Sequence, residues 1–367
     1  MRDRRVVNIA NILVNHSARI KAGEEVVLTA GPESFPLLEE VYLKVIEAGG
    51  CPLVRLDSLR LMEILFQQGN EEQVTFVSRT ELYEAEHTDA RIYIYGHKNT
   101  KTLSNISPAR QRMRRKSQQP VRDIHMKKDR WSLTIFPTDS FAQDAGMSLY
   151  DFEDYVYSAC FADEEDPLKE WDKLYRRQEE LIKSIGKVGE VRIVAPDTDL
   201  RMSVEGRTFH NSYGLRNIPC GEVYTAPVEE SVEGHIYFPL RNDYLDREMA
   251  GIRLWFEGGR AVKVTAEKGE DFLKEILKSD RGASYLGELG FGTNYKIKRF
   301  IHNILFDEKL GGSIHLALGD SYPEVGGLNK SCIHMDLILD LRKDGHVEFD
   351  GNLFLENGHI ANFNYKE

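Results

Sequence analysis

Residues 304–340 read ILFDEKLGGSIHLALGDSYPEVGGLNKSCIHMDLILD, and this stretch decides how the chain is interpreted. From 333 to 341 every odd position is apolar, whereas His334 and Asp336 occupy even positions. Successive side chains of a β-strand point to opposite faces, so this alternation predicts a strand with one buried face. The segment around His315 alternates in the same way. Two such strands, each with imidazole or carboxylate on its second face, predict the floor of a metal site.

The length and the net charge limit the class of protein. At 367 residues the chain exceeds what one hydrophobic core usually organises, so two domains are expected. The net charge of −11 argues against nucleic acid as the main partner. One local exception is a basic run, which a solvated helix face or loop explains better than an anion site. The run consists of Arg110, Arg112, Arg114, Arg115 and Lys116.

The sequence contains no pattern that directs a chain into or across a membrane. It has no run of about 18 apolar residues, so no transmembrane helix is expected. The first residues are charged and are not followed by an uninterrupted apolar segment, so a secretory signal is not expected. The four cysteines are widely spaced and form no Cys-x-x-Cys pair, which indicates free thiols. We therefore expect a cytoplasmic protein.

In the first half of the chain, short apolar segments alternate with segments of helical periodicity. Strands are predicted at 25–29, 53–56, 91–95 and 133–136. Helices are predicted at 2–15, 34–48, 58–67, 71–78 and 107–117, then in one segment that Ser148 caps and one that Pro167 opens. Strands separated by helices imply a largely parallel sheet flanked by helices. We expect an N-terminal α/β domain over residues 1–188.

The second half is dominated by strands. They are predicted at 191–194, 200–204, 235–238, 252–256 and 261–265. Two helices interrupt them, at 269–279 and 295–305. Short strands joined by glycine turns predict a mixed, β-rich α+β domain over residues 189–367, and this domain carries the expected active site.

Two further carboxylates of the C-terminal domain lie in turn-rich segments. Glu222 lies between a tight turn and a short strand in NIPCGEVYTAP, and Glu288 lies in the glycine-rich loop LGELGFGTN. Each alone is typical of a surface turn. Together with the opening stretch they give four carboxylates and two imidazoles from one domain. The set is Glu222, Glu288, Glu308, His315, His334 and Asp336.

The charge of this set suits a pair of divalent cations. Four carboxylates balance two such ions, so the site could be buried without a large uncompensated charge. Oxygen-rich ligation with one imidazole per ion fits Zn²⁺, Co²⁺ or Mn²⁺ without choosing among them. Two ions about 3.5–4 Å apart share a water molecule and lower its pKa. The alternative is that His334 and Asp336 are a polar pair on a strand face and that Glu308 pairs with a neighbouring cation.

Several motifs, in order, resemble the thermophilic aminopeptidase family of metallopeptidases, the aminopeptidase T and aminopeptidase S group. The resemblance covers nearly the whole chain. Its N-terminal part rests on the motif AQDAGMS at 142–148. Its C-terminal part rests on residues 197–200, 217–227, 286–294, 307–308, 315–319, 327–329 and 333–336.

The resemblance implies a metallo-aminopeptidase that removes N-terminal residues from peptides through a metal-activated water. The six residues named above match the family's ligands of two divalent metal ions per subunit. Tyr322 matches its active-site tyrosine, which would donate a hydrogen bond to the developing oxyanion. Glu288 or Glu308 would transfer a proton to the leaving amine. The resemblance also implies a homodimer whose subunits help to enclose the active site.

Two rival functions remain open at this point. One is a dinuclear hydrolase of another amide or ester, which would not require a free N-terminus in its substrate. The other is a non-catalytic metal-binding protein on the same fold. Metal-dependent hydrolysis of a dipeptide would eliminate the second rival.

Overall fold

The computed structural model describes residues 3–245, 247–361 and 363. By their contacts, these residues form two compact units. The first unit runs to Trp171 and also includes Gly214–Pro219; the second comprises Asp172–Tyr213 and the chain from Cys220 onward. The division rests on contacts and not on independent folding. The domain limit expected between residues 188 and 189 therefore stays a prediction.

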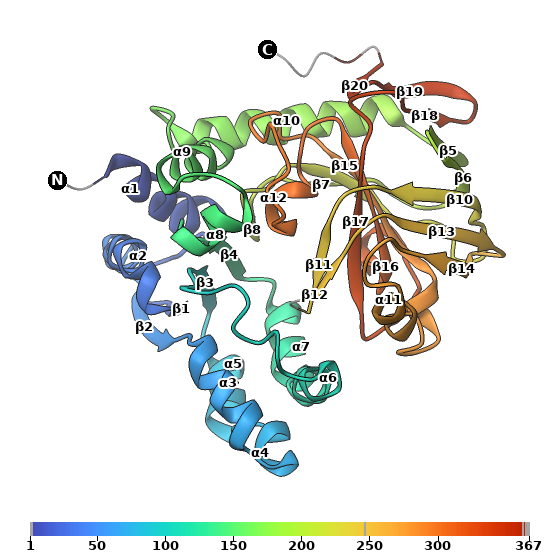
Figure 1. Ribbon diagram of the computed structural model, residues 1–367. Coiled ribbons are helices and arrows are strands. Elements are labelled where there is room, and N and C mark those ends of the chain that lie inside the picture. The colour runs from blue at the N-terminus through green and yellow to red at the C-terminus, as the bar shows by residue number, and fades with distance from the viewer. Residues whose placement is uncertain (1–2, 246, 362, 364–367) are drawn as a thin grey trace. The chain divides into compact units, whose positions relative to one another are not determined.

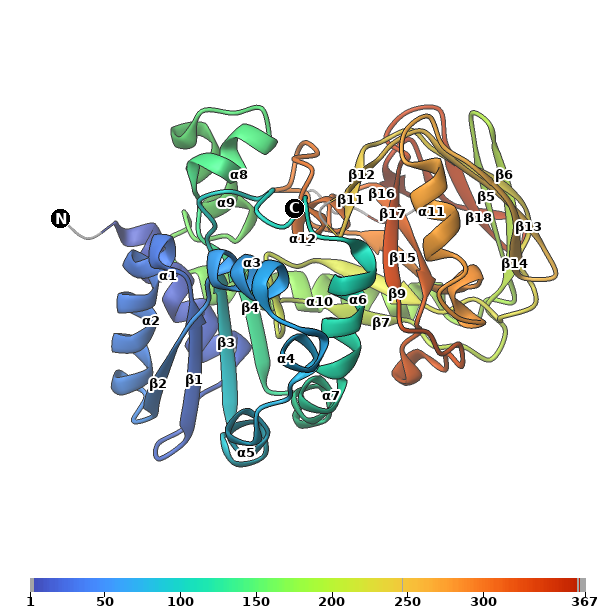
Figure 2. The ribbon, with the colours of Figure 1, turned by 60° about the horizontal axis from the view of Figure 1, so that its bottom comes forward.

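The first unit contains a parallel sheet covered by helices (Figure 1). Its strands lie in the order β2 (Cys51–Leu56), β1 (Glu25–Ala30), β3 (Ala90–Tyr95), β4 (Trp131–Ile135) and β8 (Asn217–Ile218). All four pairings are parallel, and Figure 2 shows the first four strands side by side. The parallel sheet expected from the alternation of strands and helices is confirmed.

The helices of the first unit follow the predicted segments, with three additions. They are α1 (Arg4–Asn11), which continues as a π-helical segment (Ile12–Ser17), α2 (Phe35–Glu47), α3 (Leu59–Gln68), α4 (Glu71–Thr75), α5 (Arg79–His87), α6 (Pro108–Ser117), α7 (Gln119–Lys128), α8 (Asp139–Asp144), α9 (Leu149–Ala159) and the start of α10 (Pro167–Ile185). The sequence analysis missed α5, α7 and α8. Pro120 does not prevent α7 because it lies in the first turn, where a helix needs no N–H donor from it.

The basic run lies on α6, and two of its side chains bind backbone carbonyls. Arg110 Nε donates to the carbonyl of Phe66 at 2.6 Å. Arg114 donates to the carbonyl of Phe76, which ends α4, at 2.7 Å. These arginines fasten α6 to neighbouring segments, so only Arg115 and Lys116, which are exposed, form the solvated helix face that was expected.

The second unit consists of antiparallel sheets. The larger has the order β14 (Arg260–Thr265), β13 (Ile252–Glu257), β10 (Glu233–Phe238), β6 (Thr198–Ser203), β5 (Glu190–Ala195), β18 (His346–Phe349), β19 (Asn352–Glu356) and β20 (His359–Ile360). A five-stranded sheet has the order β17 (His334–Asp340), β16 (Ser313–Gly319), β15 (Leu286–Gly292), β9 (Glu222–Thr225) and β7 (His210–Ser212). The small hairpin β11 (Asn242–Tyr244) and β12 (Arg247–Met249), with helices α11 (Glu270–Ile276) and α12 (Ile304–Asp307), completes the unit. The expected β-rich domain is confirmed.

The core of the second unit contains side chains from both large sheets. Ile193 and Leu254 of the larger sheet and Leu316 and Leu337 of the five-stranded sheet belong to one buried cluster. Because side chains alternate along a strand, the five-stranded sheet has a second face that this cluster does not use. The predicted metal ligands of its strands lie on that second face.

The prediction of a helix at 295–305 is wrong for most of that segment. Only Ile304–Asp307 is helical. The carboxylate of Asp307 accepts the backbone N–H groups of Ile301 at 2.8 Å and Asn303 at 3.1 Å. A side chain thus satisfies amides that a helix would pair with carbonyls, and the preceding loop keeps an irregular path.

Among the described helices, none combines the length and the apolar character needed to cross a membrane.

Candidate metal centre

Four adjacent strands present the centre, and small residues lie opposite its ligands. In the register of β15, β16 and β17, Ala317 lies between Glu288 and Asp336. Gly319 lies opposite His334. These small side chains leave space above the sheet for the longer polar ones. Glu288 lies on strand β15. The glycine-rich loop predicted around it is therefore wrong.

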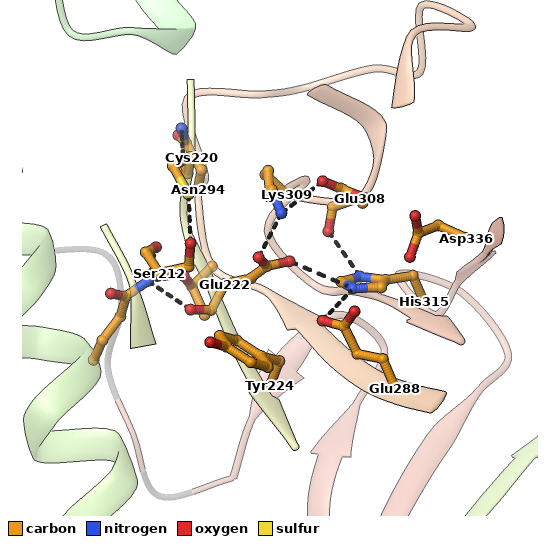
Figure 3. Close-up of polar contacts among 12 residues, drawn as sticks. Ser212, Cys220, Glu222, Tyr224, Glu288, Asn294, Glu308, Lys309, His315 and Asp336 are labelled. Carbon is orange, nitrogen blue, oxygen red and sulfur yellow. Dashed lines mark hydrogen bonds and ion pairs between the residues drawn. The ribbon is translucent and has the colours of Figure 1, made fainter. Parts of the chain in front are cut away.

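All six predicted ligands come together. They form three overlapping groups, and within each group the potential ligand atoms lie within 4.8 Å of one another. Figure 3 shows five of the six side chains converging from separate segments. The groups are Glu222 with Glu288 and His315, Glu288 with His334 and Asp336, and Glu308 with His315 and Asp336.

Each histidine turns one nitrogen to the backbone and the other toward carboxylates. His315 Nδ1 lies 3.2 Å from the carbonyl oxygen of Glu308, and its Nε2 lies 3.4 Å from oxygens of both Glu222 and Glu288. His334 Nδ1 lies 2.9 Å from the carbonyl oxygen of Asp320, and its Nε2 lies 3.3 Å from Glu288. A backbone acceptor at Nδ1 fixes the ring and directs Nε2 into the site, as in metal-ligating histidines.

Gly290 makes the position of the His315 ring possible. It lies directly opposite His315 in the β15–β16 pairing. A Cβ atom at residue 290 would lie 2.1 Å from Cε1 and 2.2 Å from Nε2 of that ring. Any side chain here would displace the imidazole. The sequence analysis noted the glycines of this segment without assigning Gly290 a role.

Two carboxylate oxygens of the centre lack hydrogen-bond partners among the described residues. They are Oε2 of Glu222 and Oδ1 of Asp336; both are inaccessible to solvent, and each has only a histidine Nε2 at 3.4 Å beside it. Buried polar atoms without a partner are rare because their desolvation is not repaid. Hard oxygen donors beside imidazole nitrogens are the ligands that divalent zinc, cobalt or manganese accepts. The residues present therefore fit a metal centre.

Lys309 is a part of the centre that the sequence analysis did not identify. Its side chain is 3% exposed, and Nζ lies 2.5 Å from Oε1 of Glu222 and 2.6 Å from Oε1 of Glu308. The ion pair considered as an alternative role for Glu308 therefore exists, but it is buried within the ligand cluster. The sequence signal was the lysine directly after Glu308.

The carboxylates and histidines shift one another's pKa values. Burial lowers the pKa of His315, but Glu288, Glu222 and Glu308 outweigh it and raise the value to about 9. Burial raises the pKa of Glu308 to about 7; Lys309 opposes this rise, and nearby carboxylates add to it. For Glu288, hydrogen bonds from the two imidazoles outweigh burial and hold the pKa below its ordinary range. Without metal ions, the negative charge of the carboxylates is thus partly balanced by protons on neighbouring side chains of the cluster.

Tyr322 lies at the edge of the cluster. Its ring centroid is 5.3 Å from that of His334 and 5.5 Å from that of Tyr224. Burial raises the pKa of Tyr322 above its ordinary range, so the hydroxyl keeps its proton at neutral pH. The sequence analysis did not identify Tyr224, whose hydroxyl donates to Glu324 at 3.3 Å.

A family model described as thermophilic metalloprotease (M29) matches residues 2–359. The chain belongs to this family. The expected resemblance is confirmed, and membership makes the M29 chain a peptidase hydrolase with a divalent metal cofactor.

Named relatives cover nearly the whole M29 chain. Aminopeptidase 2 of Geobacillus stearothermophilus is 26% identical, over 93% of this chain and 94% of the relative. Aminopeptidase T of Thermus aquaticus is 26% identical, over 95% of this chain and 94% of the relative. The solved structure of wild-type AmpT from Thermus thermophilus has a TM-score of 0.86 at 22% identity, over 98% of this chain and 99% of that one. This structural likeness confirms the expected fold class.

Proposed function

We propose that this M29 peptidase is an aminopeptidase that removes N-terminal residues from peptides at a dinuclear metal centre. The observation that carries the proposal is the convergence of four carboxylates and two imidazoles, with two buried carboxylate oxygens that lack hydrogen-bond partners. The names of the relatives support the aminopeptidase reaction.

The grouping of the side chains supports two ions rather than one. Glu288, His334 and Asp336 form one set of donors, and Glu222 and His315 form a second set that shares Glu288. Glu308 adds a carboxylate beside His315. When bound, two divalent ions supply Lewis-acid activation of a water and of the scissile carbonyl. Zinc, cobalt and manganese all fit this donor set.

Tyr322 is proposed to donate its hydroxyl hydrogen to the oxyanion that forms from the scissile carbonyl. Its ring packs against His334, and its raised pKa keeps the donor protonated. A fixed donor in a water-poor site stabilises developing negative charge without reorganisation.

Glu288 or Glu308 is proposed to transfer the proton that the leaving amine must gain. In the metal-free centre, burial raises the pKa of Glu308 to about 7. The two imidazoles hold the pKa of Glu288 low.

The test combines metal analysis with matched substrates. The purified protein should contain about two divalent ions per chain, and a chelator should abolish activity that re-added metal restores. Aminoacyl p-nitroanilides should be cleaved and their N-acetylated forms should not. Cleavage of both forms would favour a dinuclear hydrolase of other amides or esters. Metal binding without hydrolysis of any dipeptide would leave the non-catalytic alternative.

We also propose a homodimer and a cytoplasmic location. The support for a dimer is strand β2, which ends its sheet and exposes Leu53, Val54 and Leu56. Exposed apolar side chains on an edge strand are typical of a surface that pairs with another chain. A wild-type dimer in sedimentation equilibrium that Leu56→Lys converts to monomer would support this surface; a wild-type monomer would refute the dimer. None of the four cysteines, all of which lie among the described residues, forms a disulfide, which supports a reducing compartment.

A further inference from the structure

Lys309 lies between two of the proposed ligands, and the inference drawn from it rests on the proposed function. In Figure 3 its ammonium points at the carboxylates of Glu222, at the start of β9, and Glu308, at the end of α12. The Lys309 side chain is almost completely buried. A buried lysine keeps its charge only where carboxylates replace its hydration, and here both carboxylates belong to the cluster.

The backbone holds Lys309 in this place. The N–H of Asn294 donates to the carbonyl of Lys309 at 3.0 Å, while the Asn294 side chain donates to the carbonyl of Cys220 at 2.8 Å. Asn294 thus links the segment of Lys309 to the segment that leads into β9. At Gly292, a Cβ would lie 2.0 Å from the carbonyl oxygen of Leu310, so this close approach of the chains requires glycine. The backbone of Lys309 is thus held by neighbouring segments, and its ammonium is held by the two carboxylates.

We propose that Lys309 is a positioning residue of the metal centre. Its ammonium holds one oxygen of Glu222 and one oxygen of Glu308, so that each carboxylate presents its other oxygen to a metal ion. For Glu222 that other oxygen is Oε2, which lies 3.4 Å from His315 Nε2 and has no hydrogen-bond partner among the described residues. Lys309 thereby makes both carboxylates single-oxygen ligands.

Lys309 also sets the charge of the loaded centre. Four carboxylates and two divalent ions are neutral together, and the ammonium adds one positive charge. This added positive charge favours a substrate carbonyl oxygen that gains negative charge during hydrolysis. Loss of the ammonium should therefore lower kcat more than it raises KM.

The direct test is a crystal structure of the zinc-loaded wild-type protein. Nζ of Lys309 should lie within hydrogen-bond distance of the non-ligating oxygens of Glu222 and Glu308. Ligation of zinc through both oxygens of either carboxylate, or displacement of Nζ from both, would overturn the proposal. This test does not depend on whether any variant folds. Failure of the wild-type protein to bind zinc would instead count against the proposed function.

A variant test adds a spectroscopic measurement. Lys309→Met should change the visible absorption spectrum of bound Co²⁺, because a freed carboxylate oxygen alters the coordination. Its kcat should fall about 10–100-fold with KM within about threefold, as for other partners of metal ligands. Lys309→Arg, which keeps the charge, should recover part of the loss. Lys298→Met removes an exposed lysine of the same unit and should behave as wild type. A wild-type spectrum and kcat in Lys309→Met would refute the positioning role.

Discussion

Two histidines, one in each unit, have pKa values that shift in opposite directions. Burial, together with Arg91 and Lys128, lowers the pKa of His125 in the first unit to about 4. Burial also acts to lower the pKa of His315 in the second unit, yet the carboxylates around it raise the value to about 9. The same residue type is therefore neutral in one unit and protonated in the other at pH 7.

The two surroundings differ in how their charges balance. Around His125, Arg91 donates to the ring Nε2 at 3.0 Å and to Thr29 at 3.3 Å, and it pairs with Glu84 at 3.5 Å. These charges and donors satisfy one another. Around His315, four carboxylates face Lys309 and two imidazoles, and the imidazoles must give up their protons when they bind a metal ion. An excess of buried negative charge favours a bound cation, whereas a balanced cluster needs none.

The largest effect should follow from removing a ligand. We expect Glu222→Ala or His334→Ala to lower peptidase activity by at least about 100-fold with the fold intact, because changes to mere partners of ligands already cost about 10–100-fold. Activity, metal content and circular dichroism measure the outcome. His125→Ala is the control from the balanced cluster and should keep its metal. Near-wild-type turnover with metal still bound in either ligand variant would contradict the assignment.

A smaller but still large effect should follow from Gly290→Ala. The added Cβ would overlap the His315 ring, so the imidazole must move out of the cluster. We expect metal affinity to fall about 10–100-fold in a competition titration with a chelating dye. Gly189→Ala is the matched control, since a Cβ there meets only a carboxylate oxygen of Asp350 at 3.3 Å. Equal metal affinity in both variants would show that His315 does not need this space.

The opposite pKa shifts predict how metal binding depends on pH. Metal ligands must be deprotonated, and without metal His315 (pKa about 9) and Glu308 (pKa about 7) hold protons at pH 6. Metal binding should therefore release protons at pH 6, and apparent affinity should rise with pH until about pH 9. Calorimetry in buffers of different ionisation enthalpy measures the release. No release at pH 6 would contradict the predicted protonation, and His125 should contribute nothing because it is already neutral.

The smallest effect on the metal centre should come from a substitution in the balanced cluster of His125, Arg91 and Glu84. Arg91→Met removes the partner of His125 and Glu84, and we expect the free energy of unfolding to fall by about 1–3 kcal/mol. The pKa of His125 should rise, because Arg91 is one cause of its low value. Urea unfolding and an NMR titration of His125 measure these changes. Metal content should stay at the wild-type level; its loss would show that the two clusters are not independent.

Much of the fold could be predicted from local periodicity. The alternation around His315 and His334 predicted two strands and the face on which these residues lie, because a period of two is fixed by strand geometry alone. Helical segments such as α2 were predicted to within a residue or two. The helix at 295–305 failed because Asp307 binds the amides of its loop, and neither composition nor periodicity reports such a contact.

The sequence by itself determined the residue types of the centre. Through strand alternation it also determined that His315, His334 and Asp336 lie on the face of the sheet opposite the apolar side chains. Only the tertiary structure decided that Glu222 and Glu288 approach the two histidines, since strand pairing sets distances between residues far apart in the chain. It also decided the roles of Gly290 and Lys309. A missing Cβ matters only where another ring fills the space, and a lysine is part of a buried centre only where the fold removes water from it.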